Sequence, residues 1–263
     1  SDKEIQKLLD YYESAGSDKS LLAEVYYYAG SVYRDLNDAP QALEYFQKAL
    51  DALSTDGNIT LKSNIYNQSA HLFLHQTLFR EALKMFKQSY LCDSIINDTS
   101  AMVYSVKDIA YTYDKLRKPD SAFIYYNIAY EYAVQKNEVE AIGDVTGQMA
   151  DYYINRKDYV KARQYIKPLL IRNDSISNNA WYTMAVIINM RTEEHDSPLY
   201  YCNKLLEIGN AATKQMATYN LIKIYSQRKD YENIQKMLKL YTLYTDSVNK
   251  ITAIESMARM NSM

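Results

Sequence analysis

The stretch "YYYAGSVYRDLNDAPQALEYFQKAL", residues 26–50, decides the fold, because two helical patterns follow one another within it. The first places small and apolar residues at the i, i+3, i+4 and i+7 positions of one helical face: Tyr26, Ala29, Gly30 and Tyr33. After a polar turn, a second pattern reads A-x3-F-x2-A, from Ala42 to Ala49. The stretch therefore predicts a unit of two amphipathic helices joined by a short turn.

The same unit recurs along the chain at a spacing of 40 residues. Each recurrence has an alanine after a polar turn and a large apolar residue four positions later: Ala42 and Phe46, Ala82 and Phe86, Ala122 and Tyr126, Ala162 and Ile166. A second small residue recurs on the first helix of each unit: Gly30, Ala70, Ala110 and Ala150. Small residues at these positions permit two helix backbones to approach closely. The period therefore predicts a chain of helix pairs.

Composition agrees with helices throughout, because 263 residues contain only 6 glycines and 4 prolines. The formal net charge is -2, and basic residues alternate with acidic ones, so no basic stripe indicates nucleic-acid binding. The longest apolar run, "WYTMAVII" at 181–188, is far shorter than the roughly 20 residues of a membrane span. The chain is therefore expected to be all-α, with no membrane span of its own and no nucleic-acid partner.

The helix pairs resemble the tetratricopeptide repeat (TPR) family. Its first helix carries W-x2-L-G-x2-Y and its second A-x3-F-x2-A, and residues 26–49 read Y-x2-A-G-x2-Y and A-x3-F-x2-A. The resemblance covers nearly the whole chain and is clearest in the first four units. It implies a single solenoid over residues 1–263, a right-handed α-α superhelix of about six helix-turn-helix repeats.

The expected repeats follow one another without long linkers. They are a leading helix at 1–20, repeats at 21–57, 58–97, 98–136, 137–174, 175–209 and 210–245, and a capping or linker helix at 246–263. The segment "LYTLYTDSVNKI", residues 240–251, also resembles the end of periplasmic TPR sensor regions in membrane-anchored bacterial regulators. That resemblance implies a periplasmic or cell-envelope location in a Gram-negative bacterium, with an anchor outside this chain; a cytoplasmic location is the alternative.

In TPR proteins the first helix of each repeat lines a concave groove, so the resemblance implies a binding surface for a protein or an extended peptide. The residues carried over are Tyr27, Arg34, Asn64, Asn67, His71, Tyr104, Lys107, Tyr111, Asp114, Gly147, Asp151 and Tyr182. Tyrosine offers a broad apolar face and a hydroxyl, asparagine can bond both groups of a passing peptide bond, and Gly147 leaves room for close approach. The predicted function is a non-catalytic interaction module of a bacterial signalling protein.

Two other functions remain as alternatives. The leading helix lacks a partner helix of its own, so the chain could be a structural element that self-associates end to end. His71 and His75 stand at i and i+4 on one helical face, a spacing that suits a shared metal if Asp35 or Asp114 approaches, as in a metal-dependent enzyme. No H-E-x-x-H, G-x-S-x-G, phosphate-binding glycine loop or C-x-x-C motif occurs, so no catalytic residue, metal or cofactor is predicted.

Overall fold

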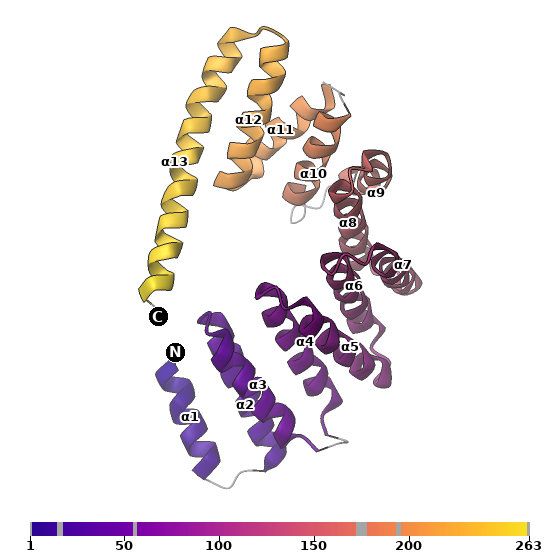
Figure 1. The fold of residues 1–263 in the computed structure, drawn as a ribbon, viewed down its shortest axis with the longest axis vertical. Helices are drawn as coiled ribbons and strands as arrows, with labels where there is room; N and C mark the ends of the chain where they lie inside the picture. The colour runs from indigo at the N-terminus through magenta and orange to yellow at the C-terminus, as the bar shows by residue number, and fades with distance from the viewer. Residues whose placement is uncertain (1, 15–17, 55–56, 172–177, 193–195, 262–263) are drawn as a thin grey trace. The chain divides into compact units, whose positions relative to one another are not determined.

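The computed structural model describes residues 2–14, 18–54, 57–171, 178–192 and 196–261. These residues form thirteen α-helices and no strand (Figure 1). The helices are α1 (Asp2–Ser14), α2 (Lys19–Asp35), α3 (Ala39–Ala52), α4 (Ile59–His75), α5 (Phe79–Ile95), α6 (Thr99–Lys115), α7 (Pro119–Lys136), α8 (Val139–Asn155), α9 (Tyr159–Ile171), α10 (Asn178–Arg191), α11 (Asp196–Ile208), α12 (Ala211–Gln227) and α13 (Tyr231–Asn261). The all-α prediction is confirmed.

The chain divides into two compact units. Unit 1 is Ser1–Val145 and unit 2 is Thr146–Met263, so the border falls inside α8. In unit 1, α2 packs on α3, α4 on α5 and α6 on α7; in unit 2, α10 packs on α11 and α12 on α13. The predicted pairing of successive helices is therefore visible inside both units.

The turns inside the pairs share one backbone motif. At the first, the Asp38 N–H donates to the Tyr33 carbonyl at 2.9 Å and the Asn37 N–H donates to the Arg34 carbonyl at 3.0 Å, which is a Schellman motif. Its central residue has a positive φ, and the same conformation recurs in four later turns, at Thr77, Arg117, Lys157 and Lys229. The first four positions are 40 residues apart, so the turns carry the same period as the helices.

The residue after the turn often caps the second helix. The Asp38 carboxylate accepts from the Gln41 N–H at 3.1 Å, and Asp158 and Asp230 accept from the third N–H beyond them at 3.2 Å. Such caps satisfy N–H groups that have no partner within the helix. The polar turn between the two apolar patterns thus ends the first helix of the pair and caps the beginning of the second.

The recurring small and large apolar residues form the core. All four alanines of the second helices are fully buried, and their partners Phe46, Phe86, Tyr126 and Ile166 are at most 2% exposed. Many of the tyrosines are used inside the helix pairs. Their rings stack at centroid distances of 5.2–5.4 Å between the two helices of a pair: Tyr33 on Tyr45, Tyr113 on Tyr125 and Tyr153 on Tyr165. These tyrosines hold the pairs together.

The C-terminal segment differs from the prediction. The sequence pattern predicts that a repeat ends at 245 and that another helix follows at 246–263, whereas α13 runs from Tyr231 to Asn261 as one helix of 31 residues. No glycine or proline interrupts this stretch, so nothing in the local sequence ends the helix at 245.

Two helical glycines should respond to alanine with opposite signs. A Cβ on Gly30 would lie 2.5 Å from Cδ1 of Phe46, whereas a Cβ on Gly147 would lie 3.5 Å from Nε1 of Trp181, an ordinary contact. We expect Gly147→Ala to raise the free energy of unfolding by up to about 1 kcal/mol through helix propensity. We expect Gly30→Ala to lower it by about 1–2 kcal/mol, because overpacking outweighs that gain. Urea denaturation measures both; equal signs would contradict the packing argument.

Between α4, α5 and α6 the core contains a cluster of buried polar side chains. Asp93 is 2% exposed; its carboxylate accepts from the Ser105 hydroxyl at 2.6 Å and from the Ser63 hydroxyl. The Ser89 hydroxyl lies 3.0 Å from that of Ser63 and 3.3 Å from that of Ser105. Forty residues earlier and later, the equivalent positions are all buried and apolar: Ala23, Ala49, Leu53 and Ile65, then Val103, Ala129, Ala133 and Val145. Among these three equivalent sets of positions in unit 1, only the set on α4, α5 and α6 is therefore polar.

Candidate functional site

The nine predicted groove residues in unit 1 lie on α2, α4 and α6, and we call the surface they form the A-helix face. They are Tyr27, Arg34, Asn64, Asn67, His71, Tyr104, Lys107, Tyr111 and Asp114, and none is fully buried. Their neighbours on the same helices alternate between this face and the core, as Ala29 and Ala70 show with no exposed surface. The spacing of residues along α2, α4 and α6 therefore determines which side chains lie on the A-helix face.

Polar contacts join the A-helix face from one helix to the next. Nη1 of Arg34 on α2 donates to Oε1 of Gln68 on α4 at 2.6 Å. Nε2 of His71 on α4 lies 3.4 Å from Oδ2 of Asp108 on α6. These contacts place α2, α4 and α6 side by side on one surface. They also show that two of the predicted ligand-binding side chains already have partners within the protein.

Lys107 is the most enclosed cation of the face. Its side chain is 15% exposed, and its Nζ lies 4.9 Å from the centre of the Tyr104 ring and 3.9 Å from Oδ2 of Asp144 on α8. The pKa of Tyr104 is raised by burial and then by nearby carboxylates, of which Asp144 is the first. The Tyr104 hydroxyl therefore keeps its proton at neutral pH and can donate a hydrogen bond.

The second tyrosine of α6, Tyr111, has the same arrangement about two turns further along the face. Nζ of Lys115 lies 4.6 Å from the centre of the Tyr111 ring. A lysine covering one side of a ring at this distance is a cation–π contact, which holds the ring in place while its other side can receive an apolar group. Tyr104 and Tyr111 thus form a pair of preorganised aromatic surfaces on one helix.

His71 pairs with a carboxylate that the sequence pattern did not suggest. Its partner is Asp108, and its ring packs edge-on against Phe86 with centroids 5.0 Å apart. Asp35 instead accepts from Arg34 at 2.7 Å, and His75, the last residue of α4, is exposed. Within the described ranges, no group of three His, Cys, Asp or Glu side chains is arranged to hold a metal. The His71/His75 metal site thus has no support in the described geometry.

Gln68 and Asp108 were missed by the assignment of groove residues. They are 40 residues apart and so occupy the same repeat position, where the TPR pattern places no ligand contact. Their recurring polarity beside the buried positions Ser69 and Ile109 was a usable signal. What the spacing could not show is which residue of the neighbouring helix each one reaches.

The other three predicted residues belong to unit 2. Gly147 faces Trp181 and Leu169, the Asp151 carboxylate accepts from Asn155 at 3.0 Å, and the Tyr182 ring lies 5.7 Å from that of Tyr201. Tyr182 and Asp151 are half-buried, and Gly147 is buried. All three residues take part in contacts within unit 2, and none belongs to the A-helix face of unit 1.

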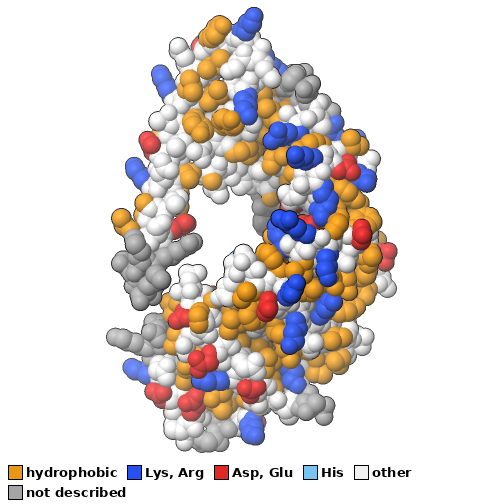
Figure 2. Space-filling view, viewed as in Figure 1, with side chains coloured by type: hydrophobic (Ala, Val, Ile, Leu, Met, Phe, Trp, Pro, Cys, Tyr) orange, Lys and Arg blue, Asp and Glu red, His pale blue; other side chains and the backbone are white. Residues whose placement is uncertain are grey.

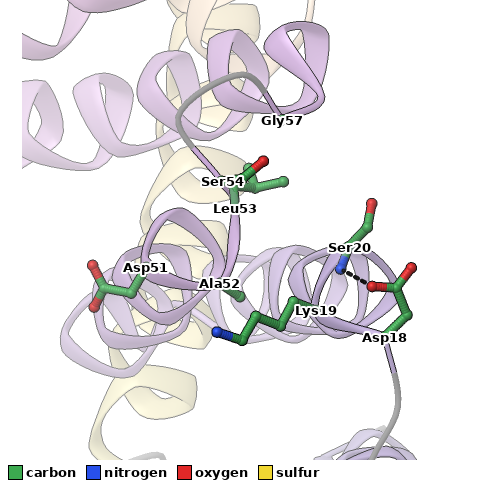
Figure 3. A pocket seen from close by; sticks show the side chains of 8 residues that line it. All are labelled: Asp18, Lys19, Ser20, Asp51, Ala52, Leu53, Ser54 and Gly57. Carbon is green, nitrogen blue, oxygen red and sulfur yellow. Dashed lines mark hydrogen bonds between the residues drawn. The ribbon is translucent and has the colours of Figure 1, made fainter.

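Two small clefts occur away from the A-helix face. In unit 1, the start of α2 and the end of α3 enclose about 280 Å³ (Figure 3), but Asp18 there caps α2 by accepting from Ser20 at 3.3 Å. Asp51 accepts from Gln47 at 2.8 Å, so its carboxylate is also engaged. In unit 2, a cleft of about 200 Å³ is lined by Arg163, which donates to Asn189 and Thr192. In both clefts these polar side chains already have hydrogen-bond partners within the protein.

On the one face that Figure 2 shows, hydrophobic side chains lie beside both basic and acidic ones. None of the described helices combines the length and the apolarity that a bilayer crossing needs.

Comparison with solved structures identifies the fold. The chain is similar to a STAND signal-transduction ATPase with a tetratricopeptide repeat sensor from Pyrococcus horikoshii, with a TM-score of 0.77, 17% identity and coverage of 95% of this chain and 40% of that one. The apo form of RapI has a TM-score of 0.63 at 13% identity, with 87% and 84% covered. A Rap conjugation regulator of plasmid pLS20 in complex with the Phr* peptide has a TM-score of 0.54 at 11% identity, with 91% and 78% covered.

These similarities establish a TPR-like helical repeat fold, as the sequence pattern predicts. No protein-family model and no curated protein matches the sequence. The chain spans less than half of the Pyrococcus protein, so it corresponds to a part of that larger molecule.

Proposed function

We propose that this chain is a non-catalytic binding module that holds an extended peptide or protein segment on the A-helix face. The observation that carries the proposal is the pair of lysine-backed tyrosines, Tyr104 and Tyr111, on the accessible side of α6. Tyr104 is 37% exposed although large aromatic side chains are usually covered in a folded protein. Aromatic rings held rigid before binding lose little conformational entropy when a partner arrives.

The amides of α4 supply the polar part of the same surface. Asn64 is exposed and Asn67 is half-buried, both on the side of α4 that carries His71. An asparagine side chain has a carbonyl oxygen and an NH₂ group, so it can pair with both groups of one peptide bond. Aromatic anchors next to peptide-pairing amides suit an extended segment better than a small compact ligand.

The charges of the face favour a segment without a strong net charge. Arg34 is neutralised by Asp35, and Lys107 lies near Asp144. A face whose cations have carboxylate neighbours produces no extended field of one sign, which a nucleic acid would require. The partner is therefore expected to be a protein or peptide recognised through side chains and backbone.

Similar structures support a regulatory role. One solved relative is a Rap regulator in complex with the Phr* peptide, another is a Rap protein complexed with competence and sporulation factor, and a third has a TPR sensor in a signal-transduction ATPase. We propose, on that support, that the chain is the sensor or interaction part of a bacterial signalling protein.

The test is a peptide array of random sequences probed with the wild-type chain and with the double variant Tyr104→Ala/Tyr111→Ala. We expect each tyrosine to contribute about tenfold to affinity, as interface anchors do, so the double variant should lose most of the bound peptides. Tyr130→Ala is the matched control, because Tyr130 is 41% exposed on α7 and outside the A-helix face. Unchanged binding by the double variant would place the ligand elsewhere.

End-to-end self-association through α1 remains the competing function. Leu8 and Tyr11 on α1 are exposed, at 39% and 66%, and could receive another chain. Light scattering at increasing protein concentration separates the two functions, since assembly through α1 would persist in the Tyr104→Ala/Tyr111→Ala variant and disappear in Leu8→Ser/Tyr11→Ser.

A further inference from the structure

The last turns of α13 extend beyond the helix on which α13 packs. Gln215 on α12 donates to Thr245 on α13 at 2.8 Å, and the rings of Tyr219 and Tyr241 lie 6.2 Å apart. Higher residue numbers on α12 pair with lower residue numbers on α13, so the two helices are antiparallel. In this register the first residue of α12, Ala211, lies beside about residue 249 of α13. Residues 250–261 therefore project about 18 Å past α12 at 1.5 Å per residue (Figure 1).

The projecting part carries large apolar side chains in water. Ile251 is 49% exposed, Ile254 is 66% exposed and Met257 is 60% exposed. All residues from 251 to 257 are exposed, so no other helix of unit 2 covers this part of α13. An unsupported amphipathic helix of about twelve residues is marginal in water unless its apolar side is covered.

The apolar positions follow a heptad spacing of alternating three and four residues. They are Met237, Leu240, Tyr244, Ile251, Ile254 and Ala258, and the polar residue Ser247 occupies the one remaining position of the series. The first part of this seam belongs to the packing on α12, where Met237 joins the cluster of Leu205 and Leu221. The second part, centred on Ile251 and Ile254, has a β-branched apolar residue at both the a and the d position of a coiled coil.

The charges beside the seam select the partner and its direction. Lys250 precedes the a position of Ile251, and Glu255 follows the d position of Ile254, so they occupy g and e. In a parallel pair of identical helices, each Lys250 faces Glu255 of the second copy. In an antiparallel pair, lysine would face lysine and glutamate would face glutamate. The charge pattern therefore complements a parallel second copy of this chain.

We propose that the end of α13 is a dimerisation helix, which pairs in parallel with a second copy of the same chain through Ile251 and Ile254. Two-fold symmetry makes the contact self-complementary. The part of the seam within residues 250–261 is shorter than two heptads, so taken by itself it supports weak and reversible association. This inference concerns another surface than the A-helix face and does not depend on the peptide-binding proposal.

Sedimentation equilibrium of the full chain tests the charge pattern. Lys250→Glu and Glu255→Lys should each weaken dimerisation about tenfold, because two attractive pairs become two repulsive ones. The double variant Lys250→Glu/Glu255→Lys should restore wild-type association to within about threefold, since the pairs re-form with their signs exchanged. A monomeric wild-type chain at the highest concentration reached, or a double variant no better than the single ones, would overturn the proposal.

Disulfide capture tests the direction and the face. Ile254→Cys lies on the seam, so a parallel dimer brings the two introduced thiols together and should yield a cross-linked dimer on mild oxidation. Thr252→Cys lies on the opposite side of the helix and is the matched control, while the native Cys92 and Cys202 are buried. Equal cross-linking of both variants, or none with Ile254→Cys, would mean that α13 is covered by something other than a parallel copy.

Discussion

Replacing Phe86 by alanine should lower the free energy of unfolding by about 3–5 kcal/mol. The side chain has no exposed surface and packs in a cluster with Ala70, Ala82 and Ile109. Two of these neighbours are alanines, which cannot move into the vacated space, so the cavity stays open and its cost stays high. Urea denaturation followed by circular dichroism measures the change, together with an unchanged helix content in the absence of urea.

Phe123→Ala is the matched control for this loss. Phe123 lies on α7 and is 37% exposed, so its truncation should change the free energy of unfolding by less than about 1 kcal/mol. If the two phenylalanines proved equally costly, the stability of unit 1 would not come from the recurring residue that follows each alanine by four positions.

The second large effect is expected at the buried carboxylate. Asp93→Ala should lower the free energy of unfolding by about 2–3 kcal/mol, because the hydroxyls of Ser63 and Ser105 lose their charged acceptor inside the core. A readout specific to unit 1 is the neighbouring thiol. Burial and the charge of Asp93 raise the pKa of Cys92, so we expect the native thiol to react slowly. Its labelling by a thiol reagent should be faster in the variant.

Replacing the whole cluster should have a different result from replacing Asp93 alone. The first repeat already shows an apolar solution at the equivalent positions, with Ala23, Ala49, Leu53 and Ile65. We expect the fourfold variant S63A/S89A/D93L/S105I to be within about 1 kcal/mol of the wild type, or more stable, since no polar group is then left without a partner. A fourfold variant as unstable as Asp93→Ala would show that the site needs its polar groups for another reason.

Local periodicity made the helices predictable. Ala42, Phe46 and their counterparts lie in the core because a spacing of three and four residues places side chains on one side of a helix whatever the helix contacts. The turns were predictable for a similar reason, since a polar residue such as Asp38 caps the next helix through atoms only three residues away. The end of α13 was misjudged because the repeat period, and not a helix-breaking residue, suggested a boundary at 245.

The candidate site could be predicted only in part. The helical period correctly places Tyr104, Lys107 and Tyr111 on the non-core side of α6, where they have exposed or half-buried side chains. It could not identify Asp108 as the partner of His71, because that contact joins helices whose relative rotation and height depend on packing. Asp93 is a charged residue at a position where the neighbouring repeats have the apolar residues Leu53 and Ala133, but the helical period alone does not show that serines from two other helices surround its carboxylate.

The sequence by itself determined the all-α class, the pairing of successive helices and the side of each helix that enters the core. These features depend on residues within a few turns of one another, where the geometry of the helix fixes distances. The tertiary structure alone decided which polar groups meet across the A-helix face, that Asp93 is held by serines from two other helices, and that the end of α13 extends past α12. Those features depend on how far and at what angle separate helices pack, which is set by the fit of many side chains at once and not by any local spacing.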